Sequence, residues 1–210
     1  MIKKNLKTLI ITSIVILIPI FIGLFLWNRL PDEIPIHWNV YGEVDDWGHK
    51  SVAVFVLPLF LLLMHWICVL ATSKDPKNQA NTEKPMLLVL WITPILSVAL
   101  STIIYITALG NELPINTVIS MILGLVFVVI GNYLPKCKQS YTIGIRIPWT
   151  LKSEENWNKT HRLAGWVWVV CGLIILVCGF FNLLWLALPF ALIVALVPII
   201  YSFILHKKGI

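Results

Sequence analysis

The sequence predicts an all-α integral membrane protein, a polytopic bundle of about six transmembrane helices with both termini in the cytoplasm. Two observations support this fold class. Of the 210 residues, 59% are hydrophobic and only 12% are charged, whereas soluble domains carry about 25% charged residues. The Lys and Arg residues are also unevenly distributed, because nearly all of them lie at the termini or in alternate loops.

Long apolar stretches supply the six expected helices, because about 18 or more residues without charge can cross a bilayer. Such stretches occur at 8–28, 51–73, 85–111, 113–135 and 163–205. The last is about twice as long as one crossing requires, and Asn182 is its expected turn. The first is longer than a signal-peptide core of about 7–15 residues, and no Ala-x-Ala site follows it. It is therefore interpreted as a retained helix.

The positions of the basic residues predict the orientation of the six spans. If both termini are cytoplasmic, the cytoplasmic side carries 14 Lys and Arg residues and the outer side carries 2. This bias satisfies the positive-inside rule. The formal net charge of +6 then follows from topology and from attraction to anionic lipid headgroups, so no direct nucleic-acid partner is expected.

The chain offers little that would hold a cofactor. It has no Cys-x-x-Cys pair, so neither a disulfide framework nor a zinc site is expected from its four cysteines. His65 is the only ionisable residue near the middle of a span. Because no span holds an acidic partner, His65 is interpreted as a neutral side chain bonded to a neighbouring carbonyl. The same absence argues against an ion-coupled transporter.

Glycines repeat at intervals of seven in two of the spans. Gly124 and Gly131 lie in the fourth, and Gly165, Gly172 and Gly179 lie in the fifth. Seven residues make nearly two helical turns, so each set lies on one helix face, where small residues allow a neighbouring backbone to approach closely. The pattern predicts packing between helices of one chain, and a homodimer seam is the less favoured alternative.

The outer loop, residues 29–50, is expected to fold as a compact cap on the membrane surface. Pro31 and Pro35 favour extended backbone, and turns are expected at the pairs Tyr41-Gly42 and Trp47-Gly48. Aromatic side chains suit the headgroup level. The residues singled out as a binding surface are His37, Trp38, Tyr41, Asp45, Asp46 and Trp47.

A metal site in this loop is an alternative, because His37, Asp45, Asp46 and His49 carry ligand groups. Their spacing matches no established metal site. The acidic side chains are instead expected to be solvated or to pair with Arg29 and Lys50, and no metal or other cofactor is predicted.

The inner segment, residues 136–162, combines aromatic, basic and helix-breaking residues. Pro148 requires an extended Ile147, and Ser153 is the expected N-cap of a short helix that runs to Arg162, with Glu154 and Glu155 in its first turn. A plain interfacial anchor explains the composition. It does not explain the ordered run of residues, from which the candidate site is taken: Asn132, Arg146, Pro148, Trp149, Thr150, Trp157, Thr160, His161 and Arg162.

The order of these motifs resembles the SdpI family of bacterial membrane proteins. The matching stretches are "GNYLPK", "GIRIPWTL" and "WNKTHRLAGWVWVVCG", and the outer loop "LPDEIPIHWNVYGEVDDWGHK" is similar to a domain of unknown function that commonly precedes the family signature. The chain departs from the family pattern at Ser140 and Ile147, where Asn and Thr are usual, so no polar role is carried over to either position. Residues 1–80 are taken as the N-terminal part and 81–210 as the SdpI-like part.

The resemblance implies a multi-pass protein of the bacterial plasma membrane that protects a cell against a secreted membrane-active killing peptide. It also implies a possible second role, in which the protein captures a winged-helix transcriptional repressor at the membrane. The peptide is expected on the outer loop, and the repressor or lipid headgroups are expected on the inner segment.

Two rival function classes follow from the same residues. One is a transporter or lipid-handling protein with a headgroup site at Arg146, His161 and Arg162. The other is an intramembrane enzyme, which is not expected because the chain lacks His-Glu-x-x-His, Gly-x-Ser-x-Gly and Walker patterns.

Overall fold

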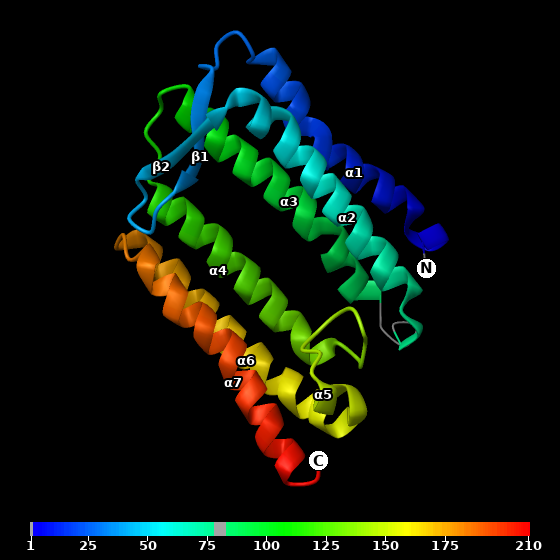
Figure 1. Ribbon diagram of the computed structural model, residues 1–210. Helices are drawn as coiled ribbons and strands as arrows, with labels where there is room; N and C mark the ends of the chain where they lie inside the picture. Colours follow the sequence, from blue (N-terminus) through cyan, green and yellow to red (C-terminus); the bar gives the residue numbers. More distant parts are fainter. Residues whose placement is uncertain (1, 78–82) are drawn as a thin grey trace. The chain divides into compact units, whose positions relative to one another are not determined.

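Six long helices and one β-hairpin form the computed structural model, which describes residues 2–77 and 83–210 (Figure 1). The long helices are α1 (Ile2–Phe25), α2 (Leu57–Lys74), α3 (Glu83–Ala108), α4 (Ile115–Tyr133), α6 (Glu154–Phe180) and α7 (Ala187–Lys207). The shorter elements are β1 (Glu33–Trp38), β2 (Val44–His49), η1 (Val52–Val56), η3 (Leu134–Lys136), α5 (Pro148–Lys152) and η4 (Leu184–Leu186). Over these described residues, six apolar spans of 21 to 27 residues are long enough to cross a membrane, which confirms the predicted bundle of about six membrane-spanning helices.

The sequence predicts the ends of α6 in part. Ser153 is its N-cap and accepts a hydrogen bond from the backbone N–H of Asn156 at 3.2 Å. Asn182 has a positive φ of 58°, which ends the helix and confirms the predicted turn. The expected end of this helix at Arg162 was wrong, because α6 continues without a break into the span. The extra helix is α5, which precedes Ser153.

The chain divides into two compact units that are not consecutive in sequence. The first unit comprises Met1–Lys74 and Met86–Leu113, and the second comprises Asp75–Pro85 and Pro114–Ile210. Helix α3 therefore belongs with α1 and α2, whereas the sequence interpretation placed it in the part beginning at residue 81.

Polar side chains tie the three helices of the first unit together. Ser97 on α3 donates to the carbonyl of Ile16 at 3.0 Å, and Tyr105 donates to the carbonyl of Pro19 at 3.0 Å. His65 on α2 is fully buried, and its Nε2 lies 3.1 Å from the hydroxyl of Thr12. The partner of His65 is thus a hydroxyl rather than the expected carbonyl.

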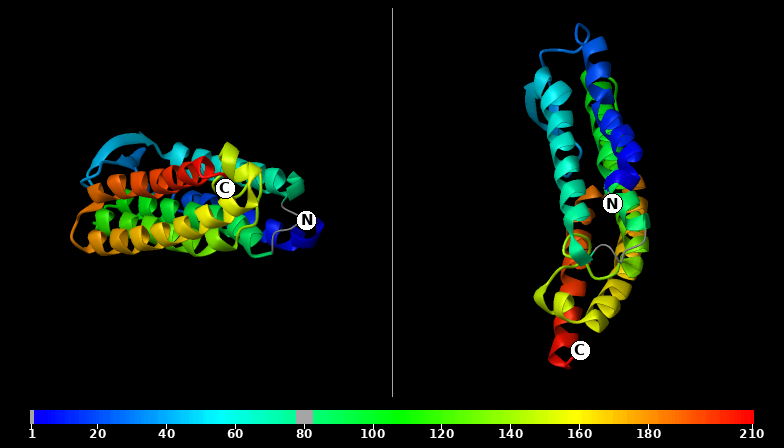
Figure 2. Two further views of the ribbon diagram at one scale, coloured as in Figure 1. Left: turned by 90° about the horizontal axis from the view of Figure 1, so that it is seen from below. Right: turned by 90° about the vertical axis from the view of Figure 1, so that its right-hand side faces the viewer.

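The hairpin packs against the ends of the first unit's helices (Figures 1 and 2). Ile34 on β1 is fully buried in an apolar cluster with Leu30 and Tyr105. Lys50, only 8% exposed, donates to the carbonyls of Trp27 and Leu30 at 3.2 and 3.3 Å. These carbonyls follow α1 and lack helical partners, so Lys50 acts as a C-terminal cap.

The second unit is centred on the pairing of α4 with α6, with α7 lying along α6 (Figure 2). The glycines predicted to allow close packing between helices lie where α4 meets α6. A Cβ added at Gly172 would lie 2.7 Å from the carbonyl oxygen of Gly124, and one added at Gly131 would lie 2.9 Å from that of Gly165. Backbone meets backbone here, which confirms that the glycine repeat serves intramolecular packing.

Candidate functional site

The hairpin turn is built by Asn39. Its side-chain oxygen accepts from the N–H groups of Tyr41 and Glu43 at 2.9 and 3.1 Å, which is the role of Asn in turns. Gly42 has a φ of 81°, a backbone conformation that favours glycine, so the predicted turn at Tyr41-Gly42 is confirmed. The second predicted turn, at Trp47-Gly48, was wrong, because both residues belong to β2 and pair with Pro35 and Ile34.

The hairpin surface is the set of predicted binding residues on β1, the turn and β2. His37 Nδ1 lies 2.6 Å from a carboxylate oxygen of Asp45. Asp46 and Trp47 are exposed on β2, Tyr41 is exposed in the turn, and Trp38 is half-buried beneath them. The hairpin therefore carries two exposed carboxylates and two exposed aromatic rings.

Of the two basic residues expected to pair with acidic residues of this loop, Lys50 does so, whereas Asp45 has a different partner. Lys50 pairs with Asp32 at 3.0 Å, and the hydrogen bond and charge of Lys50 lower the pKa of Asp32. Asp45 pairs with His37 rather than with Arg29 or Lys50. Among the described residues, no group of three or more His, Cys, Asp or Glu side chains is arranged to hold a metal ion.

The motif segment, residues 136–162 of the second unit, folds around the carboxylate of Asp75, which lies just after α2 in the chain. Asp75 is 5% exposed. One of its oxygens accepts from the Ser140 hydroxyl at 2.6 Å, the Tyr141 N–H at 2.7 Å, and the Thr142 N–H and hydroxyl at 3.1 and 3.0 Å. The other accepts from the Lys77 N–H at 2.9 Å. Four of these five donors belong to the loop that follows η3, so the carboxylate of Asp75 fixes the conformation of that loop.

This arrangement perturbs the acidity of Asp75. Burial raises its pKa, but the hydrogen bonds from Ser140, Thr142 and the backbone outweigh burial, so that its pKa lies below the usual value of 3.8. The ionised form is therefore the one that the loop binds. No polar role was carried over to Ser140 from the family pattern, but its hydroxyl donates a hydrogen bond to Asp75.

Two sets of hydrogen bonds, termed clasps, hold this loop. The first surrounds Asp75, and the second joins the loop to α6 through His161, which is 1% exposed. Its Nε2 accepts from the backbone N–H of Ile145 at 2.8 Å, so the proton lies on Nδ1, which donates to the carbonyl of Trp157 at 2.8 Å. The Trp157 ring is stacked on the imidazole, and its indole N–H donates to the carbonyl of Cys137 at 2.8 Å. His161 is thus a neutral structural side chain with both nitrogens occupied.

Gly144 is required for this clasp. Its φ of 104° lies in the region that favours glycine. A Cβ at this position would lie 2.5 Å from Nε2 of His161 and 2.9 Å from the Trp157 ring. The glycine allows the loop backbone to lie directly on the two stacked rings.

Asn156 carries a buried polar network between α6 and α7. Its amide nitrogen donates to the carbonyls of Ser202 and Ile210 at 3.0 and 3.2 Å. Its amide oxygen accepts from the hydroxyls of Ser202 and Thr160 at 2.7 and 3.1 Å. Every hydrogen-bonding atom of the Asn156 side chain is therefore paired within the unit.

The predicted motif residues separate into a buried group and an exposed group. Trp157, Thr160 and His161 are buried on α6, and Thr150 is buried on α5. Trp149 is half-buried, and its ring lies 5.8 Å from that of His206 and 5.5 Å from that of Phe203. The exposed members are Asn132, Arg146, Pro148 and Arg162.

Arg146 donates to the carbonyl of Tyr141 at 2.9 Å. It therefore connects two positions of its own loop.

Sequence patterns did not identify three residues of this site: Asp75, Lys77 and Asn156. Lys77 donates to Gln139 at 2.8 Å and lies over the Tyr141 ring at 4.8 Å. For Asp75, the available signal was an Asp-Pro pair directly after a span, a pattern that is typical of an ordinary loop. For Asn156, its spacing of four residues from Thr160 on the inward face of α6 was the usable signal.

Comparison with known proteins gives three results. Residues 136–202 match the SdpI/YfhL protein family, and residues 14–62 match a domain of unknown function, DUF1648. The chain is also 30% identical, over 98% of its length and 97% of the relative, to a Bacillus subtilis (strain 168) protein described as "Immunity protein SdpI". No solved structure matches. Together with the six apolar spans, these matches make the chain a multi-pass bacterial membrane protein.

Proposed function

Because this chain belongs to the SdpI/YfhL protein family, we propose that it is a membrane immunity protein that protects a bacterium against a secreted, membrane-active killing peptide. The observation that carries this proposal is the extent of the similarity to an immunity protein, which includes both the hairpin and the motif segment. A protein of this kind must meet the peptide at or within the membrane, and the hairpin surface offers chemistry suited to that task.

The hairpin surface suits a cationic amphipathic peptide. Asp45 and Asp46 are exposed carboxylates, and charge complementarity of this kind accelerates encounter. Tyr41 and Trp47 are 71% and 56% exposed, and such rings supply apolar contact at the headgroup level. The strands hold these groups on a rigid frame, because Ile34 anchors the hairpin in the unit's core.

The direct test is survival of a peptide-sensitive bacterium that expresses this chain and is challenged with killing peptide purified from the culture supernatant of a producing bacterium. We expect cells with the chain to tolerate a higher peptide concentration than cells with empty vector. Unchanged survival would contradict the proposal and favour the lipid-handling alternative.

Charge removal at the hairpin surface should weaken this protection. Replacing both Asp45 and Asp46 with Asn is expected to lower the tolerated peptide concentration about tenfold, because two exposed charges contribute about 1.4 kcal/mol together. The matched control replaces both with Glu, which keeps the charge and should keep the protection. Full protection by the Asn variant would show that charge attraction is unimportant.

The orientation proposed from the positive-inside rule places the hairpin outside the cell and the motif segment inside. A Cys introduced at exposed Arg146 is then expected to react with a membrane-impermeant maleimide only after the cells are opened. The nearby Cys137 contributes little background, because it is buried and burial raises its thiol pKa to about 11. Labelling of position 146 in intact cells would contradict this orientation and indicate the opposite one.

The proposed signalling role rests on the exposed members of the motif segment. Arg146 and Arg162 present positive charge on a loop and helix that the Asp75 and His161 clasps hold in one conformation. A winged-helix repressor that docks there would respond to the peptide only if peptide binding favours one of two conformations of the protein. Recruitment of a fluorescent repressor to the membrane, measured with and without peptide, tests this role.

A further inference from the structure

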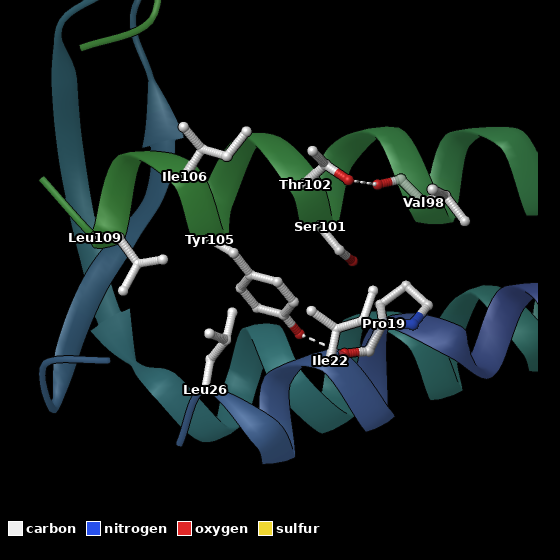
Figure 3. A pocket seen from close by; sticks show the side chains of 9 residues that line it. All are labelled: Pro19, Ile22, Leu26, Val98, Ser101, Thr102, Tyr105, Ile106 and Leu109. Carbon is white, nitrogen blue, oxygen red and sulfur yellow. Dashed lines mark hydrogen bonds between the residues drawn. The ribbon is translucent and has the colours of Figure 1, made fainter. Parts of the chain in front are cut away.

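The first unit contains a pocket between α1 and α3 that the hairpin surface does not use (Figure 3). It has a volume of about 230 Å³, and its lining includes Pro19, Ile22, Leu26, Ser101, Tyr105 and Leu109. Leu26 and Tyr105 also border the apolar cluster that anchors the hairpin. The pocket therefore extends from the base of the hairpin into the membrane-spanning part of the unit.

One polar group in this pocket has no partner. Ser101 is 1% exposed, and its hydroxyl makes no hydrogen bond within the described residues. Figure 3 shows this hydroxyl pointing from α3 into the space beside Pro19 and Ile22. The side chains one turn to either side, Ser97 and Tyr105, both donate to carbonyls of α1. Ser101 thus lies unpaired between two side chains of α3 that hydrogen-bond to α1, and its hydroxyl faces the pocket.

The depth of Ser101 restricts what such a partner is. The α3 span, Met86–Ala108, covers about 35 Å at 1.5 Å per residue, and Ser101 lies about 10 Å from its end. Since the hydrocarbon core is about 30 Å thick, this hydroxyl lies well inside it. The ester carbonyls of a phospholipid remain at the boundary of that core, so an acyl chain fills apolar space there without offering Ser101 a hydrogen bond.

An inserted peptide does bring polar groups to this depth, because its backbone and side-chain hydroxyls or amides travel with its apolar side chains. We propose that the pocket between α1 and α3 receives an apolar side chain of the membrane-inserted killing peptide, with the Ser101 hydroxyl bonded to a polar group of that peptide. The inference rests on the proposed immunity function and adds an intramembrane site below the hairpin surface. The small Ser101 side chain also allows a second helix to approach closely.

Survival measurements with three variants test the site. Ser101→Phe fills the pocket and is expected to lower the tolerated peptide concentration at least tenfold, and Ser101→Ala, which removes only the hydroxyl, about threefold. Ile95→Phe is the control for added bulk, because Ile95 is 60% exposed on the same helix and does not line the pocket. Protection by Ser101→Phe equal to that of the unaltered chain would overturn the proposal.

Photo-crosslinking tests the site independently of survival and of any folding defect in Ser101→Phe. Benzoylphenylalanine is placed at Thr102, which is exposed at the pocket, or at Ile95, and the protein is reconstituted in phosphatidylethanolamine–phosphatidylglycerol vesicles with the same purified peptide. A peptide adduct at 102 and not at 95 supports the site. Lipid adducts alone, or equal peptide adducts at both positions, overturn it. A specific adduct without protection by the unaltered chain would refute the immunity function but retain the site.

Discussion

Replacing Gly172 with Leu is expected to lower the free energy of unfolding by about 3 kcal/mol or more. A Cβ at this position would lie 2.7 Å from the carbonyl oxygen of Gly124 and 2.9 Å from the backbone nitrogen of Val128. Neither atom can move without displacing α4, so the added side chain must separate the helices and forfeit their dispersion contacts. Thermal unfolding in detergent, followed by the loss of monodisperse protein, measures the change.

The control for Gly172→Leu is Val170→Leu on the same helix. Val170 is 48% exposed, and its enlargement should leave stability nearly unchanged. Gly172→Ala should have an intermediate effect of about 1–3 kcal/mol. If Gly172→Leu unfolds at the temperature of the unaltered chain, α4 and α6 do not pack at the distance described.

Replacing Asp75 with Asn is expected to cost about 3 kcal/mol near neutral pH. The carboxylate accepts five hydrogen bonds, including those from Ser140, Tyr141 and Thr142. An amide offers one oxygen in place of two and directs an NH₂ group at donors, which leaves buried N–H or O–H groups unpaired. The motif segment should loosen first, so protease sensitivity between residues 136 and 147 is a suitable second measurement.

The effect of Asp75→Asn should depend on pH in a defined direction. The pKa of Asp75 is lowered in the folded protein, so its contribution to stability is complete above the unfolded pKa of about 3.9 and disappears as pH falls through the folded value. The difference between Asp75→Asn and the unaltered chain is thus expected to be constant from about pH 5 to 8 and to shrink below about pH 4. A difference that persists unchanged at pH 3 would contradict an ionised Asp75.

The parts of the fold that were predictable from sequence are those set by local rules. Span lengths follow from the hydrocarbon thickness, the Ser153 cap and the Asn182 turn follow from backbone chemistry, and the glycine repeat follows from helix periodicity. The hairpin was less predictable, because Trp47-Gly48 has the composition of a turn but pairs with β1. Its strands are held by tertiary contacts of Ile34 that no local pattern reveals.

The candidate site was predictable only in outline. Trp157 and His161 have the amphipathic character of interfacial side chains, yet both are buried because distant backbone groups, the Cys137 carbonyl and the Ile145 N–H, pair with them. Asp75 was overlooked for the same reason, since its five donors include residues 65 to 67 positions further along the chain. Sequence patterns report which side chains have polar groups, whereas the satisfaction of those groups is decided by the packed fold.

The interleaved order of the two units limits how the gene can be divided. Asp75 and Lys77 belong to the second unit although α2 and α3, on either side of them, belong to the first. A fragment that starts at Pro114 would keep all of the family-signature residues 136–202 but lose the anion around which residues 140–142 close. Grafts, split reporters and truncations that aim to preserve that signature must therefore also include Asp75 and Lys77, which precede α3 in the sequence.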